Sequence, residues 1–120
     1  MKKLLIILLL PLLALSCTAQ HPGIHPISAA ELQTALNEKI QLVDVRTAAE
    51  FNGGHLYNAL NIDVNSADFD AKIQQLDKTK PVYIYCQSGK RSSNAAKKME
   101  SLGFRTIYDL KGGILSWNNK

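Results

Sequence analysis

The 120-residue sequence predicts one α/β domain of three layers, in which helices flank a central, mainly parallel sheet. Two observations lead to this fold class. Short apolar runs typical of strands alternate with helical segments along most of the chain, and no repeat or low-complexity segment interrupts them. Strands that are joined through a helix pair in parallel, by a right-handed crossover.

Two capping boxes mark the first helices. Ser28 is followed three residues later by Glu31, which predicts a helix that extends to about residue 37. Thr47 and Glu50 repeat this pattern and predict a short helix that stops near the two glycines at 53–54. Because Ser and Thr side chains cap free amides at helix starts, both assignments have a physical basis.

The later helices have other signals. Phe69, Ile73 and Leu76 recur at helical spacing within residues 66–76. Residues 92–102 are rich in Ala and Lys and precede Gly103, a typical C-cap residue. Residues 114–117 are expected to form a last helical turn. Strands are expected in the apolar runs 40–45, 60–64, 82–86 and 106–110.

The first segment has the pattern of a secretory signal peptide, which we assign to residues 1–16. Lys2 and Lys3 precede an apolar run of about 12 residues, against the roughly 20 that a helix needs to cross a bilayer. Cys17 follows this run, as in bacterial lipoproteins, and we expect it to be lipidated. The protein would then be exported, either periplasmic or held to a membrane by its lipid. Ordinary cleavage that yields a soluble exported protein is the alternative.

Residues 17–26 are assigned to the lipidated cysteine and a polar tether, and residues 27–120 to the domain. His21 and His25 lie in the tether without a third ligand nearby, so we expect no metal site. No cofactor is expected either.

Charge and cysteine content exclude several classes of protein. Removal of residues 1–16 lowers the formal net charge from +4 to +2, because this segment holds two lysines and no acidic residue. No cluster of Lys and Arg interleaved with aromatic residues remains, so nucleic acid is not an expected partner. If Cys17 is lipidated, Cys86 is the only thiol. This argues against a disulfide framework, a Cys-x-x-Cys redox motif and a cysteine zinc site.

Cys86 lies where chemistry is expected. It ends an apolar strand and opens a loop with Gly89 and the cations Lys90 and Arg91, after which a helix begins. Backbone amides and the positive end of the helix dipole stabilise an anion in such a loop. They favour the thiolate of a cysteine at its entrance, and the thiolate is the nucleophilic form. In parallel α/β sheets, ligands bind beyond the carboxyl ends of strands, which is where Cys86 lies.

From about residue 27 to residue 120, the chain resembles a single-domain rhodanese, a member of a sulfurtransferase family. Four segments carry the resemblance: Asp44-Val45-Arg46 with Glu50-Phe51 and Gly54-His55-Leu56; Ala59-Leu60-Asn61-Ile62; Cys86-Gln87-Ser88-Gly89-Lys90-Arg91-Ser92; and Leu110-Lys111-Gly112-Gly113 with Trp117. Asn58 departs from the glycine that is common in the family, and Asn tolerates a positive φ better than most residues.

The resemblance implies a catalytic role for Cys86, which would take a sulfane sulfur from a donor such as thiosulfate as a persulfide and pass it to a thiophilic acceptor. The expected partner is therefore a small sulfur-containing anion or a thiol acceptor. By the same resemblance, the substrate-binding loop comprises Gln87, Ser88, Gly89, Lys90 and Arg91, whose backbone amides would surround the outer sulfur. Asp44, Arg46, Glu50 and His55 would form a hydrogen-bonded network that supports the fold.

Other interpretations stay open. Cys86 could be an inert core cysteine, Lys90 a solvated surface residue, and Arg91 partly structural. Trp117 is expected to be a core or surface-sealing aromatic side chain. A Cys-dependent phosphatase or arsenate reductase needs five residues between cysteine and arginine, whereas four lie between Cys86 and Arg91. A rhodanese-like module that binds proteins or senses sulfur or redox state, without turnover, is the main alternative function.

Overall fold

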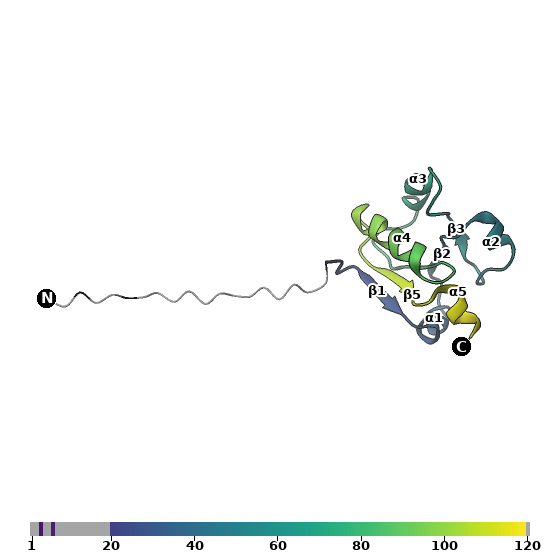
Figure 1. Cartoon of the computed structure of the whole chain (residues 1–120), viewed down its shortest axis with the longest axis horizontal. Helices are drawn as coiled ribbons and strands as arrows, with labels where there is room; N and C mark the ends of the chain where they lie inside the picture. The colour runs from purple at the N-terminus through teal and green to yellow at the C-terminus, as the bar shows by residue number, and fades with distance from the viewer. Residues whose placement is uncertain (1–2, 4–5, 7–19, 120) are drawn as a thin grey trace.

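The computed structural model describes residues 3, 6 and 20–119, and a five-stranded sheet forms its centre (Figure 1). The strands are β1 (Ile24–Ile27), β2 (Gln41–Asp44), β3 (Leu60–Asn61), β4 (Val82–Tyr85) and β5 (Ile107–Leu110). They lie in the order β1-β5-β4-β2-β3, and every neighbouring pair is parallel. The predicted α/β fold with a parallel central sheet is confirmed.

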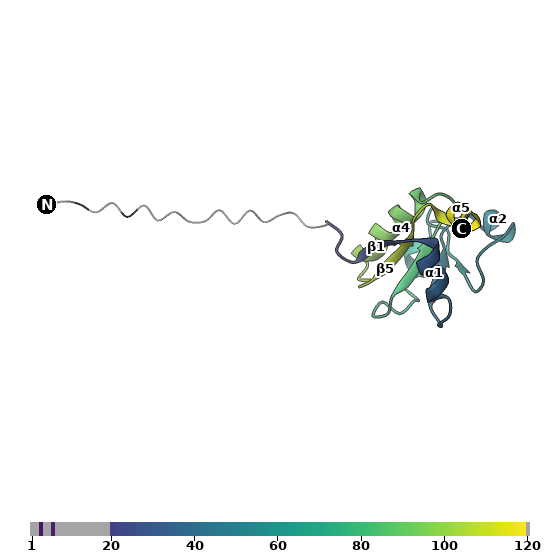
Figure 2. The same ribbon diagram turned by 90° about the horizontal axis from the view of Figure 1, so that it is seen from below.

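Helices cover both faces of this sheet (Figures 1 and 2). They are α1 (Ala29–Ala35), α2 (Ala48–Asn52), α3 (Phe69–Ile73), α4 (Lys90–Ser101) and α5 (Gly113–Asn118). On one face, Phe69 of α3 and Met99 of α4 join a buried apolar cluster with the strands. On the other face, Leu32 of α1 and Ile114 of α5 join a second cluster. The sheet is therefore the middle of three layers.

Both predicted capping boxes are present. Ser28 accepts a hydrogen bond from the Glu31 amide at 3.1 Å, and Thr47 accepts one from the Glu50 amide at 3.2 Å. Each glutamate side chain reaches back to the backbone amide of its cap residue, at 3.3 Å in both boxes. The starts of α1 and α2 therefore lie where the sequence predicts them.

The start of the domain differs from the sequence assignment. The tether was assigned to residues 18–26, but Ile24–Ile27 form the edge strand β1, which pairs with β5. The residues just before β1 are also held in place: the carboxylate of Glu100 contacts His21 Nδ1 at 2.7 Å and accepts a hydrogen bond from the Gly23 amide at 2.9 Å. The folded unit therefore begins before residue 27.

Several element boundaries also differ. α4 begins at Lys90, two residues earlier than expected, because Gly89 turns the chain with φ 113° directly before it. The strand expected at 60–64 is only Leu60–Asn61, and the helix expected at 66–76 is only Phe69–Ile73. Asp68 makes no side-chain cap for α3, which leaves that helix without a strong start signal.

The described residues include no helix of the length and apolar character that crossing a membrane requires. The predicted lipidation site Cys17 and, apart from residues 3 and 6, the predicted signal peptide lie outside the described residues.

Candidate active site

Cys86 follows the carboxyl end of β4 and lies beneath its loop. Its residue surface is only 1% exposed, and the backbone N–H of Gly89 donates a hydrogen bond to its Sγ at 3.0 Å. The hydroxyl of Ser92 lies 3.5 Å from the same sulfur and donates to the Gly89 carbonyl oxygen at 3.2 Å. The loop therefore wraps around the sulfur atom instead of displaying it on the surface.

The start of α4 supplies further donors next to this sulfur. Within residues 20–119, the amides of Lys90, Arg91 and Ser92 have no backbone acceptor, as expected for the first turn of a helix. These amides and the helix dipole favour negative charge at the loop. Lys90 and Ser88 are exposed, and the latter lies between Cys86 and the turn at residue 89.

The start of α5 holds the loop from its other side. The amide of Ile114 donates to the Cys86 carbonyl oxygen at 2.9 Å, and the amide of Leu115 donates to the Gln87 carbonyl oxygen at 3.2 Å. Gly113 allows this approach, because a Cβ atom built there would lie 2.6 Å from the Cys86 carbonyl oxygen and would also clash with that of Gln87. Gly113 was not among the predicted site residues, although it belongs to the segment Leu110-Lys111-Gly112-Gly113 that carries part of the resemblance.

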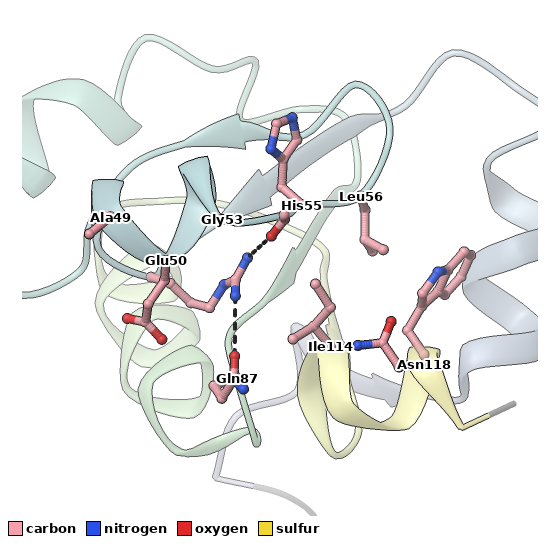
Figure 3. A pocket seen from close by; sticks show the side chains of 11 residues that line it. Ala49, Glu50, Gly53, His55, Leu56, Gln87, Ile114 and Asn118 are labelled. Carbon is pink, nitrogen blue, oxygen red and sulfur yellow. Dashed lines mark hydrogen bonds between the residues drawn. The ribbon is translucent and has the colours of Figure 1, made fainter.

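A buried ion pair lies beside the loop. Arg46 Nη2 lies 2.7 Å from Asp44 Oδ2, and both side chains are almost fully buried. The same guanidinium donates to Gln87 Oε1 at 3.1 Å and to the Gly54 carbonyl oxygen at 2.8 Å (Figure 3). Hydrogen bonding to Asp44 raises the pKa of Arg46 further above its already high value. Arg46 therefore ties the end of β2 to the loop after Cys86 as a permanent cation.

A second ion pair joins α2 to α4. Arg91 Nη1 and Nη2 donate to the two carboxylate oxygens of Glu50 at 2.6 and 2.8 Å. This arginine lowers the pKa of Glu50 to about 2, and Thr47 adds to the effect. Arg91 was predicted to bind substrate. Its guanidinium is engaged by Glu50 in this structure, and the substrate role stays a prediction.

His55 stands apart from both ion pairs. It is exposed, its ring stacks on that of Phe51 at 3.7 Å between centroids, and its Nδ1 lies 2.9 Å from the Phe51 carbonyl oxygen. The expected four-residue network is therefore divided. Asp44 with Arg46 and Glu50 with Arg91 are two separate pairs, and His55 joins neither.

A pocket of about 580 Å³ opens beside the loop. Figure 3 shows Glu50 and Gln87 on one side of it and Ile114 and Asn118 of α5 on the other, with His55 and Leu56 above. Trp117 also lines this pocket, so it has a place at the site as well as against the core. Because Gln87 directly follows Cys86, the pocket adjoins the loop that encloses the sulfur.

One carboxyl group near the sulfur was missed by the sequence analysis. Asp109 lies on β5, and within residues 20–119 its buried Oδ1 has no hydrogen-bond partner. Burial raises the pKa of Asp109 to about 6, and the neighbouring Ser92 partly offsets this effect. No group of His, Cys, Asp and Glu among the described residues could hold a metal ion.

The comparisons with known proteins agree with this geometry. Residues 28–120 match the family model described as a rhodanese-like domain. The chain is 42% identical over 82 residues to the uncharacterized protein YqhL of Bacillus subtilis; the match covers 68% of this chain and 64% of YqhL. It is 35% identical over 81 residues to the thiosulfate sulfurtransferase GlpE of Shewanella oneidensis, covering 68% of this chain and 78% of that protein.

Solved structures show the same similarity. A rhodanese-related protein from Thermoplasma volcanium superposes with a TM-score of 0.70 at 30% identity, over 79% of this chain and 91% of that one. The chain spans slightly less than two thirds of the length of YqhL. With the match to the family model and the loop around Cys86, these findings establish that the chain belongs to the rhodanese-like domain family.

Proposed function

We propose that this protein is an exported sulfurtransferase that moves a sulfane sulfur from an anionic donor such as thiosulfate to a thiol acceptor. The observation that supports this most is the hydrogen bond of 3.0 Å from the Gly89 amide to Cys86 Sγ, at the start of a helix whose first-turn amides are free of backbone acceptors. A loop built in this way stabilises negative charge on and next to the sulfur.

The reaction proceeds through two displacements. The Cys86 thiolate attacks the outer sulfur of thiosulfate, a new S–S bond forms, and sulfite leaves with the electron pair of the broken S–S bond. The outer persulfide sulfur then carries the negative charge, which the loop amides stabilise. An acceptor thiolate attacks that outer sulfur in the second step, and the electron pair of the persulfide bond returns to Cys86.

The four-residue spacing between Cys86 and Arg91 supports a sulfur cargo over a phosphoryl group, because the loop is one residue shorter than phosphate-ester chemistry of this type uses. Arg91 is also engaged with Glu50 instead of reaching into the loop as a free cation. Turnover of an aryl phosphate by the purified protein would contradict this assignment.

Intact mass spectrometry tests the sulfurtransferase directly. After incubation with thiosulfate, the purified protein is expected to gain the mass of one sulfur atom and to lose it to cyanide or to a thiol. Cys86→Ser, which keeps the size of the side chain, should gain nothing. An unchanged mass in the wild type, with no transfer, would favour a module that binds or senses without turnover.

Export and anchoring form a separate part of the proposal. The charged start, short apolar run and Cys17 of the sequence support cleavage after residue 16 and acylation of Cys17, with the protein in the periplasm or on a membrane surface. Metabolic labelling with a fatty acid should mark the wild type and not Cys17→Ser. Label in both variants, or in neither, would contradict lipidation at Cys17.

A further inference from the structure

Asp109 points toward the same side of the sheet as Cys86. In the parallel register of β4 and β5, Ile84 is the partner of Asp109, and Cys86 lies two residues beyond Ile84. Because side chains alternate along a strand, Ile84 and Cys86 share a face. Ile107, two residues before Asp109, belongs with them to the apolar cluster under α4. The carboxyl group is therefore placed beneath the first turn of α4.

Ser92 of that first turn lies between the two groups. It is fully buried, its hydroxyl is 3.5 Å from Cys86 Sγ, and it is the neighbour that acts on the Asp109 carboxyl. In this structure the hydroxyl donates to the Gly89 carbonyl oxygen. A serine hydroxyl has one proton and free rotation, so it can donate to one side while it accepts from the other.

We infer that Asp109 and Cys86 share one proton through the Ser92 hydroxyl, and that Asp109 holds this proton while Cys86 is a thiolate or a persulfide. This inference rests on the proposed role of Cys86 as the nucleophile. In the transfer, the S–H bond of Cys86 breaks as Ser92 takes its proton, and the original hydroxyl proton of Ser92 forms an O–H bond on Asp109. No charge is gained or lost by the three residues together.

The reason for sharing is electrostatic. Two ionised groups on either side of the buried Ser92 hydroxyl oppose each other, so the second proton is released only at higher pH. Burial raises the pKa of Asp109 to about 6, so this carboxyl group keeps its proton to a higher pH than an exposed aspartate does. The neutral acid form also avoids repulsion of an anionic sulfur donor.

Among residues 20–119, the charged groups around the site form no ion pair with Asp109. On the α4 side, Arg91 interacts electrostatically with Cys86 and with Asp63, but its guanidinium is engaged by Glu50 of α2. Lys90 is exposed.

On the β1 side, the ring of His25 lies 5.5 Å from that of Tyr108, on the face of the sheet opposite to Asp109. Tyr85 of β4 belongs to the apolar cluster on that same opposite face. Neither group therefore faces Cys86 and Asp109.

Alkylation of Cys86 by iodoacetamide tests the inference without any sulfur donor. Rates would be measured between about pH 4 and pH 9, in the wild type, in Asp109→Asn and in Ser92→Ala. The wild-type profile of alkylation rate against pH should have two steps. The Asp109→Asn profile should have one step, at lower pH. At neutral pH this variant should be alkylated about tenfold faster than the wild type, because the opposing charge is gone. Ser92→Ala should move the main step to higher pH, since the hydroxyl no longer donates to the thiolate.

The pH steps of Asp109→Asn and Ser92→Ala should thus shift in opposite directions. A purely structural role of the two residues would change the alkylation rates without moving the steps. Asp70→Asn, an exposed site on α3, is the matched control and should follow the wild type. If all profiles coincide, or if both site variants move in the same direction, the inference is wrong. If the wild type shows the two-step alkylation profile but transfers no sulfur, the proposed function is wrong and the shared proton stands.

A direct readout covers the case in which a variant fails to fold. The carboxyl carbon of Asp109, followed by NMR in the wild type, should titrate in two steps, and in Cys86→Ala in one step near about pH 6. A single step with the same midpoint in both proteins would overturn the inference.

Discussion

Cys86 is positioned mainly by backbone groups. Its sulfur accepts a hydrogen bond from the Gly89 amide, and its carbonyl oxygen accepts one from the Ile114 amide. These two contacts act on opposite sides of the same residue, and they come from the starts of two different helices. The orientation of the sulfur therefore depends on how closely α5 approaches the loop, and Gly113 determines that distance.

Gly113→Ala is expected to displace the loop. The residue has φ 62°, and an added Cβ would lie within contact distance of two carbonyl oxygens of the loop. We expect a loss of about 2 kcal/mol or more in the free energy of unfolding, measured in urea, together with loss of sulfur loading on Cys86.

Gly53→Ala is the matched control for this prediction. Gly53 lines the same pocket, but its φ is −76° and an added Cβ would be 3.5 Å from the nearest atom, an ordinary contact. Equal stability losses in the two variants would contradict the role assigned to Gly113.

At this scale the sequence predicted the residues that are adjacent in the chain and missed those that are adjacent only in space. Cys86 and Gly89 lie in one contiguous motif, so their proximity follows from the sequence. The approach of Gly113 to the loop, and that of Asp109 to Ser92, depends on the register of β4 and β5 and on the packing of two helices. No local pattern contains that information.

At the scale of elements, Glu50 belongs to two structures. It completes the capping box of α2, where its Oε1 lies 3.1 Å from Thr47 Oγ1, and it binds Arg91 at the start of α4. A short helix with no buried residue thereby fixes the arginine of the loop. The capping box of α1 has the same chemistry without any link to the site.

These two capping boxes form a matched pair for mutation. Thr47→Ala and Ser28→Ala should each lower the free energy of unfolding by about 1 kcal/mol, the usual value for loss of an N-cap. Only Thr47→Ala should also slow persulfide formation, because it loosens the carboxylate that orients Arg91. Urea unfolding and the rate of sulfur loading measure the two effects. Equal slowing in both variants would contradict the link.

Element prediction from the sequence succeeded where the local signals were strong and failed at β1. Both capping boxes and the strand before Cys86 were predicted. Residues 24–26 include His25 and Pro26, which are atypical of a strand, and they were assigned to a tether. A proline is tolerated there because β1 is an edge strand, where a ladder hydrogen bond can be absent.

For the whole molecule, two carboxyl groups make stability depend on pH in opposite directions. Glu50 has a pKa of about 2 in the folded state, below its usual 4.5, so its contribution is present above about pH 4.5 and is lost as pH falls toward 2. Asp109 has a pKa of about 6, above its usual 3.8. The folded state therefore binds more protons than the unfolded state in that interval, and stability falls as pH rises through it.

Asp109→Asn should remove this loss of stability at higher pH. The variant is expected to match the wild type near about pH 4 and to exceed its free energy of unfolding by up to about 3 kcal/mol near about pH 8, the equivalent of a two-unit shift. Urea unfolding at both pH values measures the difference. A variant that is less stable than the wild type at the higher pH would show that the ionised carboxylate stabilises the fold.

The amino end of β1 and the Cys86 loop lie at opposite ends of the parallel strands, because every strand runs in the same direction. If the chain is anchored through Cys17, this polarity turns the loop away from the bilayer and toward the surrounding solution. Lipid-dissolved sulfur compounds would face the wrong end of the domain. Water-soluble donors and partner proteins that approach from the aqueous side would meet the loop first.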